Sequence, residues 1–303
     1  MSDSAPRTAS IRHVLVVGAG AMGSQISMVC ALAGYQVTMT DLDQTALDRA
    51  LEQLRGRMER NVSKSRLTAD ERDAAFARLA TSTDPLAPAA SADLVIEAAV
   101  EDLGVKKELF ASLDAACPEN TILASNSSSF VPSAMASATN RADRFCNIHF
   151  FNPALVMKCV EVVRGPETSD QTSNTAVAFV ESIDKVPVVL EKEIRGFIAN
   201  RILGAVRDEA LFLYGNGYAD IESIDTACRT ALGYPMGPFE LMDLTGIDIG
   251  YRVKSALYAE TGDPADAPHP AVAELVERGD VGRKSGKGWY VYDSDGNKTG
   301  VNS

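Results

Sequence analysis

The residues of this chain best suited to chemistry are Ser128, His149 and Glu161. A histidine can take or give a proton near neutral pH, a carboxylate can fix its tautomer and stabilise the charged ring, and a serine hydroxyl can hydrogen-bond a substrate oxygen. This set suits proton transfer to or from an alcohol. His149 opens the sequence His-Phe-Phe-Asn-Pro, where a hydrogen-bonded core or turn histidine is the competing interpretation.

A dinucleotide-binding pattern near the N-terminus bears on that choice. Residues 14–17 form an apolar, β-branched run that ends at glycine, and residues 21–33 follow at helical spacing. Between them, Gly18 makes the tight turn, Gly20 lets a pyrophosphate approach the backbone, and Gly23 lets the helix pack on the strand. The predicted phosphate-binding residues are Gly18, Gly20, Ala21, Met22 and Gly23.

Asp41 stands at the end of the second predicted strand, residues 36–40. A carboxylate there accepts hydrogen bonds from the adenosine ribose and repels a 2′-phosphate, which favours NAD over NADP. The N–H groups at the start of the helix face the phosphates. Simple turn glycines are a weak alternative once strand, helix and acidic residue occur together. Because a nicotinamide cofactor needs a partner that handles the proton when hydride moves, His149 acquires a role.

The chain has 303 residues, of which 46% are apolar, enough for two domains with ordinary cores. Its formal net charge of −12 argues against nucleic acid or anionic membrane as a partner. A polar N-terminus without a secretory signal, and the lack of a membrane-length apolar run, predict a cytoplasmic protein. Five scattered cysteines predict buried reduced thiols rather than a disulfide framework or a zinc site: Cys30, Cys117, Cys146, Cys159 and Cys228.

Strand and helix patterns alternate along the first two thirds of the chain. After the first two strands, strand-like runs recur at residues 94–96, 121–123, 144–148, 160–163 and 186–190. This alternation predicts an α/β fold with a doubly wound, mostly parallel Rossmann-type sheet. Residues 44–80 are predicted to be an inserted helical hairpin, whose second helix begins at a capping box, Thr68 to Glu71, and carries Phe76 and Leu79.

Helical periodicity dominates after about residue 195, and strand signals nearly vanish. We therefore predict an NAD-binding domain over residues 1–194 and an all-α domain for substrate binding and dimerisation over residues 195–303. The first helix of this second domain is apolar enough to suggest pairing with another subunit, and a plain intradomain core is the alternative.

Several further motifs, taken with the glycine loop, resemble the 3-hydroxyacyl-CoA dehydrogenase family, of the 3-hydroxybutyryl-CoA dehydrogenase type, over essentially the whole chain. They are residues 95–102, 124–129, 149–153, 157–158, 160–162, 196–201, 233–240 and 282–290. The resemblance implies NAD-dependent oxidation of (S)-3-hydroxyacyl-CoA to 3-oxoacyl-CoA and the reverse, with short acyl chains, in a homodimer.

By that resemblance, His149 is the general base that takes the proton of the 3-hydroxyl, and Glu161 holds its imidazole. Ser128 and Asn200 hydrogen-bond the substrate oxygen or the thioester region, and Asn200 comes from the second domain. Cofactor contacts are further implied at Glu101, Lys106, Asn152 and Lys284. For Lys106, a solvated charge on a helix is the competing interpretation.

Basic side chains gather on the predicted hairpin, namely Arg55, Arg57, Arg60, Lys64 and Arg66. The resemblance places the pantetheine and the CoA phosphates near this hairpin, whereas a solvated helix face is the bland alternative. Leu155 and Arg195 stand where the family commonly has proline. These two departures bear on substrate range and domain closure rather than on the acid–base pair.

Two other functions remain open from the sequence. The same chemistry would serve a free hydroxy acid or an acyl-carrier-protein thioester. Alternatively, the protein is a non-catalytic NAD-binding structural or sensor protein. The joint presence of Ser128, His149, Glu161 and Asn200 argues against this, because a silent scaffold has no need of all four. Acyl-chain length, direction and pathway are not specified.

Overall fold

The computed structural model describes residues 11–302, which fall into two compact units that divide between Ile198 and Ala199. The predicted boundary followed residue 194. Ile198 stays with the first unit, and its backbone N–H donates a hydrogen bond to Glu161 at 3.0 Å. Most of the polar N-terminal stretch considered above lies outside the described residues.

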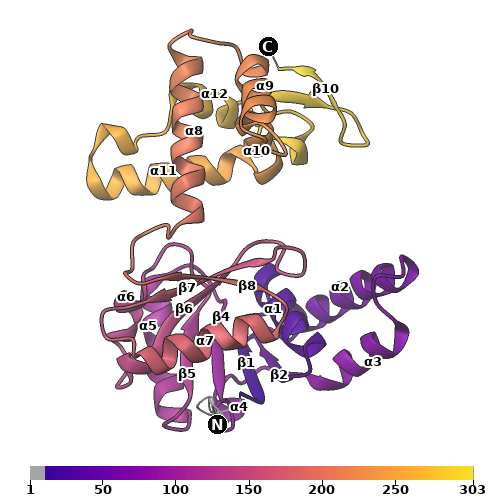
Figure 1. The fold of residues 1–303 in the computed structure, drawn as a ribbon, viewed down its shortest axis with the longest axis vertical. Coiled ribbons are helices and arrows are strands. Elements are labelled where there is room, and N and C mark those ends of the chain that lie inside the picture. Colours follow the sequence, from indigo (N-terminus) through magenta and orange to yellow (C-terminus); the bar gives the residue numbers. More distant parts are fainter. Residues whose placement is uncertain (1–10, 303) are drawn as a thin grey trace, which may run out of the picture. The chain divides into compact units, whose positions relative to one another are not determined.

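An eight-stranded sheet forms the centre of the first unit, in the order β3-β2-β1-β4-β5-β6-β7-β8 (Figure 1). Its strands are β1 (His13–Val17), β2 (Gln36–Thr40), β3 (Leu79–Ser82), β4 (Leu94–Glu97), β5 (Ile122–Ser125), β6 (Phe145–Phe150), β7 (Cys159–Arg164) and β8 (Val186–Leu190). All neighbours are parallel except β6 and β7, which are antiparallel. This confirms the doubly wound, mostly parallel sheet.

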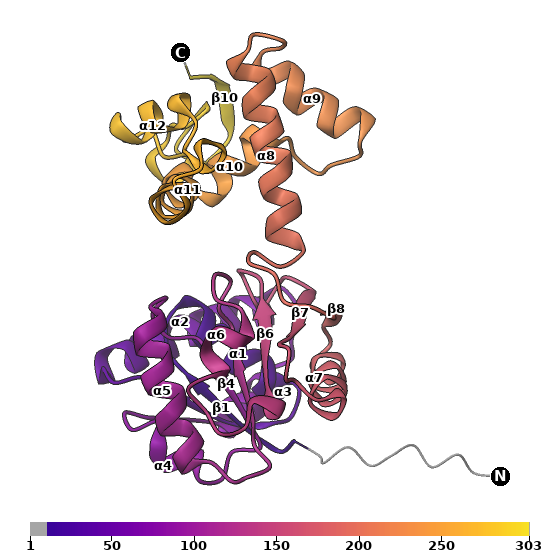
Figure 2. The ribbon, with the colours of Figure 1, turned by 90° about the vertical axis from the view of Figure 1, so that its left-hand side faces the viewer.

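Helices cover both faces of this sheet, and Figure 2 shows α5 and α7 on opposite sides of it. The helices of the first unit are α1 (Ala21–Leu32), α2 (Gln44–Ser63), α3 (Ala69–Arg78), α4 (Leu86–Ala89), α5 (Leu103–Ala116), α6 (Pro132–Ala136), α7 (Asp170–Ser182) and the short 3₁₀ turn Ala142–Arg144. Val14 and Val16 pack with α1 on one face, whereas Leu15 packs with Phe110 of α5 on the other. Because β1 is covered on both sides, it is apolar at successive positions.

The inserted hairpin forms as α2 and α3. Thr68 makes the predicted capping box, because its hydroxyl accepts from the Glu71 N–H while the Glu71 carboxylate accepts from the Thr68 N–H. One detail was wrong. Leu79 does not belong to the second helix but begins β3, where it lies opposite Val37 of β2, so sheet pairing ends the helix at Arg78.

The second unit is mainly helical, with α8 (Ala199–Gly215), α9 (Ile221–Ala231), α10 (Pro238–Thr245), α11 (Ile247–Thr261), α12 (Pro270–Glu277) and 3₁₀ turns at Pro264–Asp266 and Arg283–Ser285. It is not all-α, because β9 (Tyr290–Tyr292) and β10 (Lys298–Val301) form an antiparallel hairpin. Tyr290 and Tyr292 both turn into the core, and buried Asp243 accepts hydrogen bonds from the Tyr290 N–H and the Tyr292 hydroxyl. No helix among residues 11–302 is long and apolar enough to cross a membrane.

All five cysteines are free thiols. Cys30, Cys117 and Cys146 are buried, and Cys159 and Cys228 are half-buried. Burial raises the pKa of Cys30 and Cys146 to about 12 and that of Cys117 to about 11, so these three are protonated and inert at neutral pH.

Candidate active site

Two glycines of the loop after β1 are required by the packing of the protein itself. Gly18 has a φ of +108°, and a Cβ there would lie 2.5 Å from the carbonyl oxygen of Ala98. A Cβ on Gly23 would lie 1.9 Å from the carbonyl oxygen of Gly18. Gly18 therefore permits the turn, and Gly23 lets α1 lie against it, as predicted.

Gly20 is different, because nothing in the structure lies within 4 Å of the place where its Cβ would be. It is the N-cap of α1 and contributes no side-chain cap, and Ala21 and Met22 follow in the first turn. The space beside Gly20 and the N–H groups at the start of α1 fit a nucleotide phosphate. A bound dinucleotide would explain a glycine that the protein's own packing does not need.

Asp41 follows β2 directly and lies beside the glycine loop. One of its carboxylate oxygens accepts from the Ala19 N–H at 2.9 Å and the other from the Asp43 N–H at 3.1 Å. Each carboxylate oxygen has a second lone pair, so the group can also accept from ribose hydroxyls. The geometry fits the role predicted for an NAD-binding acidic residue.

His149 and Glu161 lie directly opposite each other in the antiparallel pair of β6 and β7. The Nδ1 atom of His149 is 2.8 Å from the Oε2 atom of Glu161. Both residues are buried, at 5% and 1% exposed. The strand prediction ended at Ile148, but β6 continues to Phe150, and this continuation sets the histidine opposite the carboxylate.

The imidazole of His149 is fixed on several sides. The rings of Phe151 and Phe197 meet it edge-on, with centroids 4.6 Å and 5.3 Å away. The second carboxylate oxygen of Glu161 accepts the Ile198 N–H at 3.0 Å. Because an ionised carboxylate only accepts, Nδ1 is the protonated nitrogen of the neutral ring, and Nε2 is left as the acceptor for a substrate proton.

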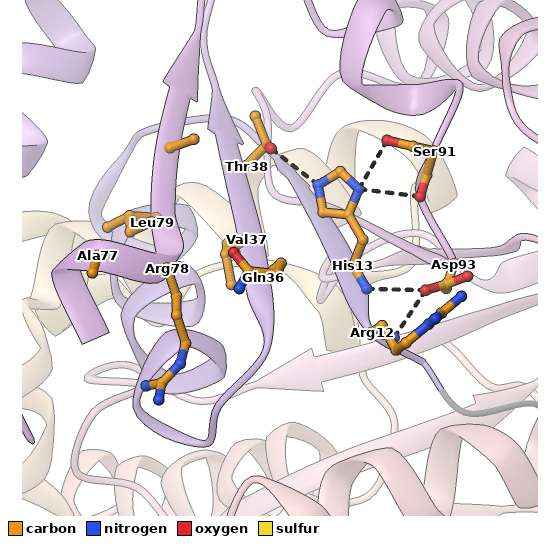
Figure 3. A pocket seen from close by; sticks show the side chains of 11 residues that line it. Arg12, His13, Gln36, Val37, Thr38, Ala77, Arg78, Leu79, Ser91 and Asp93 are labelled. Atoms are coloured by element: carbon orange, nitrogen blue, oxygen red, sulfur yellow. Dashed lines mark hydrogen bonds between the residues drawn. The ribbon is translucent and has the colours of Figure 1, made fainter. Parts of the chain in front are cut away.

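The other two histidines of the sequence have structural roles. His13 lines a cavity of about 540 Å³ at the amino ends of β1 and β2 (Figure 3). The glycine loop follows the carboxyl end of β1, at the other end of that strand. The His13 ring nitrogens bond Ser91 and Thr38 at 3.0–3.1 Å. His269 caps α12 by accepting from the Ala271 N–H at 3.3 Å. Within residues 11–302, His149 is the one of the three that pairs with a carboxylate.

The loop between β5 and α6 carries Ser128 and is bonded to β6 on both sides of His149. The side-chain amide of Asn147 donates to the carbonyl of Phe130 at 2.9 Å, and the Phe150 N–H donates to the Asn126 side chain at 2.9 Å. Ser128 itself is half-buried. The loop that carries Ser128 is therefore held beside the histidine strand.

Lys106 is buried, at 1% exposed, so the solvated interpretation is wrong. Its ammonium contacts Glu97 at 2.5 Å and Glu101 at 3.1 Å. Glu101 also accepts from the Ser127 hydroxyl. Burial by itself would raise the pKa of Glu101, but the Ser127 hydrogen bond and the Lys106 charge outweigh it and lower that pKa.

Glu97 is the residue that sequence reasoning missed. It ends the apolar strand β4 and is 0% exposed. A carboxylate inside an apolar run requires partners, because an unpaired buried charge is very costly. That rule, applied to the sequence, would have singled out Glu97 and a nearby cation.

The remaining predicted residues lie at separate places. Asn152 is exposed just after β6. Asn200 is in the first turn of α8, in the second unit. Lys284 also belongs to the second unit, where its ammonium pairs with Asp248. Their assigned contacts with cofactor or substrate stay predictions.

Two of the motifs that carried the resemblance form the core of the second unit. Asp225 accepts from the backbone N–H groups of Phe239 and Glu240 and from the Tyr290 hydroxyl at 2.8–3.1 Å. A Cβ on Gly237 would lie 2.2 Å from the Asp225 side chain, and one on Gly288 would lie 2.0 Å from that of Asp243. These glycines admit buried aspartates, so the two motifs serve packing.

On the hairpin, the basic residues are divided. Arg55 lies over the ring of Phe76 at 5.0 Å, and Arg57 donates to Gln25 at 3.0 Å. Arg60, Lys64 and Arg66 are exposed, and none of the three has an ion pair within residues 11–302. At Leu155, one of the two departures from the family, the backbone N–H reaches the same Gln25 oxygen at 3.4 Å, a contact that proline cannot make.

Comparison with known proteins agrees with this geometry over both units. Residues 13–194 match the 3-hydroxyacyl-CoA dehydrogenase NAD-binding domain, and residues 196–292 match the C-terminal domain of the same family. The chain is 40% identical to human mitochondrial hydroxyacyl-coenzyme A dehydrogenase over 288 residues, covering 93% of this chain and 91% of that one. It is 38% identical to a probable 3-hydroxybutyryl-CoA dehydrogenase of Bacillus subtilis, covering 93% and 98%.

Among solved structures, (S)-3-hydroxybutyryl-CoA dehydrogenase PaaH1 from Ralstonia eutropha superimposes with a TM-score of 0.87 at 38% identity, covering 94% of this chain and all of that one. Family models thus match both units, and relatives match nearly the full length. The chain belongs to the 3-hydroxyacyl-CoA dehydrogenase family.

Proposed function

We propose that the protein is an NAD-dependent dehydrogenase that interconverts (S)-3-hydroxyacyl-CoA and 3-oxoacyl-CoA. The observation that carries this proposal is the buried pair of His149 and Glu161, whose Nδ1–Oε2 distance is 2.8 Å. Family membership supports the same reaction. So does the glycine loop, because the protein's own packing does not require a glycine at position 20, whereas a bound dinucleotide would.

In the oxidative direction, Nε2 of His149 accepts the proton of the substrate 3-hydroxyl. Glu161 stabilises the resulting imidazolium and keeps the ring in one tautomer. When bound, NAD supplies the hydride acceptor. In the reductive direction, the imidazolium returns the proton to the 3-oxo oxygen.

Other residues orient the reactants in this proposal. Ser128 hydrogen-bonds the reacting oxygen or the thioester, and Asn200 assists it from the second domain. The cofactor is contacted by Glu101, Asn152 and Lys284. Lys106 holds Glu101 in place through their ion pair. The exposed cations of the hairpin, Arg60, Lys64 and Arg66, suit the CoA phosphates and give the acidic protein a local basic surface.

We further propose short acyl chains, a cytoplasmic location and a homodimer. The second unit exposes large apolar side chains on α8 and α11: Ile202, Leu203, Phe212, Ile249 and Val253. A group of apolar residues of this kind is typical of a subunit interface. Light scattering coupled to size exclusion, comparing the protein with an Ile202→Asp variant, tests the dimer, and a concentration-independent monomer contradicts it.

The experiment that tests the reaction follows NADH absorbance with acetoacetyl-CoA as substrate. Free acetoacetate and acetoacetyl carried on an acyl carrier protein are compared at matched concentrations. We expect the CoA thioester to be preferred by at least about tenfold, since contacts with the CoA phosphates add binding energy that the free acid lacks. Preference for either alternative identifies a different carrier. Absence of NADH oxidation with all three supports the non-catalytic scaffold.

A further inference from the structure

The loop of residues 125–130 carries Ser128 between two sets of hydrogen bonds. On the N-terminal side, the Asn126 N–H donates to the Glu97 carbonyl at 2.7 Å, and the Ser127 N–H donates to the Ser125 hydroxyl at 3.1 Å. On the C-terminal side, the N–H groups of Ser129 and Phe130 donate to the Ser127 hydroxyl at 3.2 Å and 3.0 Å. The conformation at Ser128 therefore depends on two serine hydroxyls, those of Ser125 and Ser127.

Both hydroxyls are oriented by carboxylates. The Ser125 hydroxyl donates to Glu97 at 2.6 Å. The Ser127 hydroxyl donates to Glu101. A serine that donates to a carboxylate must turn its lone pairs elsewhere, here toward backbone N–H groups. The carboxylates thus decide which way each hydroxyl points.

The two carboxylates meet at one buried cation. The Lys106 ammonium lies 2.5 Å from Glu97 and 3.1 Å from Glu101. Glu97 and Lys106 are 0% and 1% exposed, so their attraction is little screened by water. The Ala99 N–H fills a further acceptor site of Glu97 at 2.7 Å. Glu97 thus contacts Lys106, the Ser125 hydroxyl and the Ala99 N–H together, which suits it to holding the loop in place.

We propose that Glu97, paired with Lys106, is a positioning residue for Ser128. It acts through two arms, by which we mean two series of hydrogen bonds and ion pairs that fix the chain on either side of Ser128. The first arm runs from Glu97 to Ser125. The second runs through Lys106 and Glu101 to Ser127. This inference deepens the proposed function and rests on it for the role of Ser128. The competing role is structural, in which Glu97 merely neutralises Lys106.

The test uses Glu97→Gln and Ser125→Ala, with Ser173→Ala as the control. Ser125→Ala cuts one arm and leaves the ion pair intact, so it decides the proposal if Glu97→Gln does not fold. Ser173 is likewise buried, at 5% exposed, but lies on α7, away from the loop. The first measurement is amide hydrogen exchange of the protein without substrate.

We expect exchange to accelerate by at least about tenfold in the peptide covering residues 125–130 in both test variants. Ser125→Ala removes the acceptor of the Ser127 N–H, and Glu97→Gln disturbs the orientation of the two serine hydroxyls that accept from three N–H groups of this peptide. Exchange elsewhere, and throughout Ser173→Ala, should match the parent protein. Unchanged exchange in this peptide overturns the proposal. Because no substrate is involved, this result stands apart from the success or failure of the proposed reaction.

The second measurement is a double-mutant cycle with Ser128→Ala, read as kcat for acetoacetyl-CoA reduction. Ser125→Ala alone should lower kcat by about tenfold, as small misplacements of orienting groups do. In the Ser128→Ala background it should lower kcat by less than about twofold, because the group it positions is already missing. Equal losses in both backgrounds assign Glu97 and Ser125 a purely structural role.

Discussion

Each unit contains a buried carboxylate network, and the two networks end differently. In the second unit, Asp243 accepts from two backbone N–H groups and from the Tyr292 hydroxyl at 2.8–2.9 Å. In the first unit, Glu161 accepts from the Ile198 N–H and from Nδ1 of His149. The aspartate network closes on groups that do not titrate near neutral pH, whereas the glutamate network ends at an imidazole whose other nitrogen can take a proton.

This difference separates packing from chemistry better than burial does. Glu161 and Asp243 are equally buried, at 1% exposed each. A closed network stabilises a fold because every donor is satisfied. A network that ends at a histidine retains one acceptor for a substrate. The comparison therefore predicts that changes at His149 and Glu161 affect turnover, whereas changes at Asp243 affect stability.

The largest effect is expected for His149→Gln. Loss of the proton acceptor should lower kcat for acetoacetyl-CoA reduction by roughly 10³-fold. Circular dichroism should show a folded protein. The matched control is His13→Gln, because the His13 ring is also hydrogen-bonded but lies in the cavity at the opposite end of the sheet. Its kcat should stay within about twofold. Comparable loss in both variants would show that the effect on turnover is merely structural.

Glu161→Gln should have the next largest effect. The amide keeps the shape of the side chain but removes the charge that stabilises imidazolium, so we expect kcat to fall by about 10²-fold, less than for His149→Gln. Glu193→Gln serves as the control, because Glu193 also accepts a backbone N–H, that of Ser133 at 2.9 Å, without contacting a histidine. Normal turnover in Glu161→Gln would mean that Glu161, like Asp243, only stabilises the fold.

Asp243→Ala should lower the free energy of unfolding and leave kcat nearly unchanged. Three buried donors lose their acceptor, and the expected loss is about 3 kcal/mol in the free energy of unfolding of the second unit. Urea unfolding followed by tryptophan fluorescence reports it, since Trp289 is one of those donors. Asp208→Ala, which breaks a half-exposed surface pair with Lys254, should cost less than about 1 kcal/mol. Equal losses would mean that the Asp243 network contributes little.

The sequence predicted well those elements that depend on a local pattern of residues. The apolar run before the glycines forms β1, and the Thr68 capping box starts α3. Gly18 makes the turn with a positive φ, and a Cβ on Gly23 would collide with the Gly18 carbonyl of the same strand–turn–helix unit. Such features depend on residues close in the chain, so spacing alone specifies them.

The rest depends on pairing between distant segments. The register of β6 and β7 sets His149 opposite Glu161, but the sequence does not indicate that this strand pair is antiparallel. For Lys106, predicted as a cofactor contact, a solvated surface charge stayed open as the alternative because its partner, Glu97, comes from the preceding strand. β9 and β10 form a hairpin stabilised by Asp243, a residue of the distant helix α10. Burial and register are tertiary properties, which override local pattern.

The smallest and most specific test of the comparison is the pH dependence of Asp243→Asn. Burial raises the pKa of Asp243 despite the opposing hydrogen bonds from Trp289 and Tyr290. A carboxyl group with a raised folded-state pKa contributes stability that is full below its unfolded pKa, about 3.9, and that declines as pH rises through the folded value. Asparagine does not titrate.

The difference in unfolding free energy between the parent protein and Asp243→Asn should therefore be largest near pH 4 and narrow toward pH 7. Asp248→Asn gives the opposite trend, because the Lys284 hydrogen bond lowers the pKa of Asp248, and the stability it contributes appears only above the unfolded pKa. Urea titrations of the three proteins at four pH values measure both trends. If the difference in unfolding free energy between the parent protein and Asp243→Asn widened as pH rises, the Asp243 carboxylate would be stabilised in its ionised form. The Asp243 and Glu161 networks would then differ only in that the second ends at a histidine.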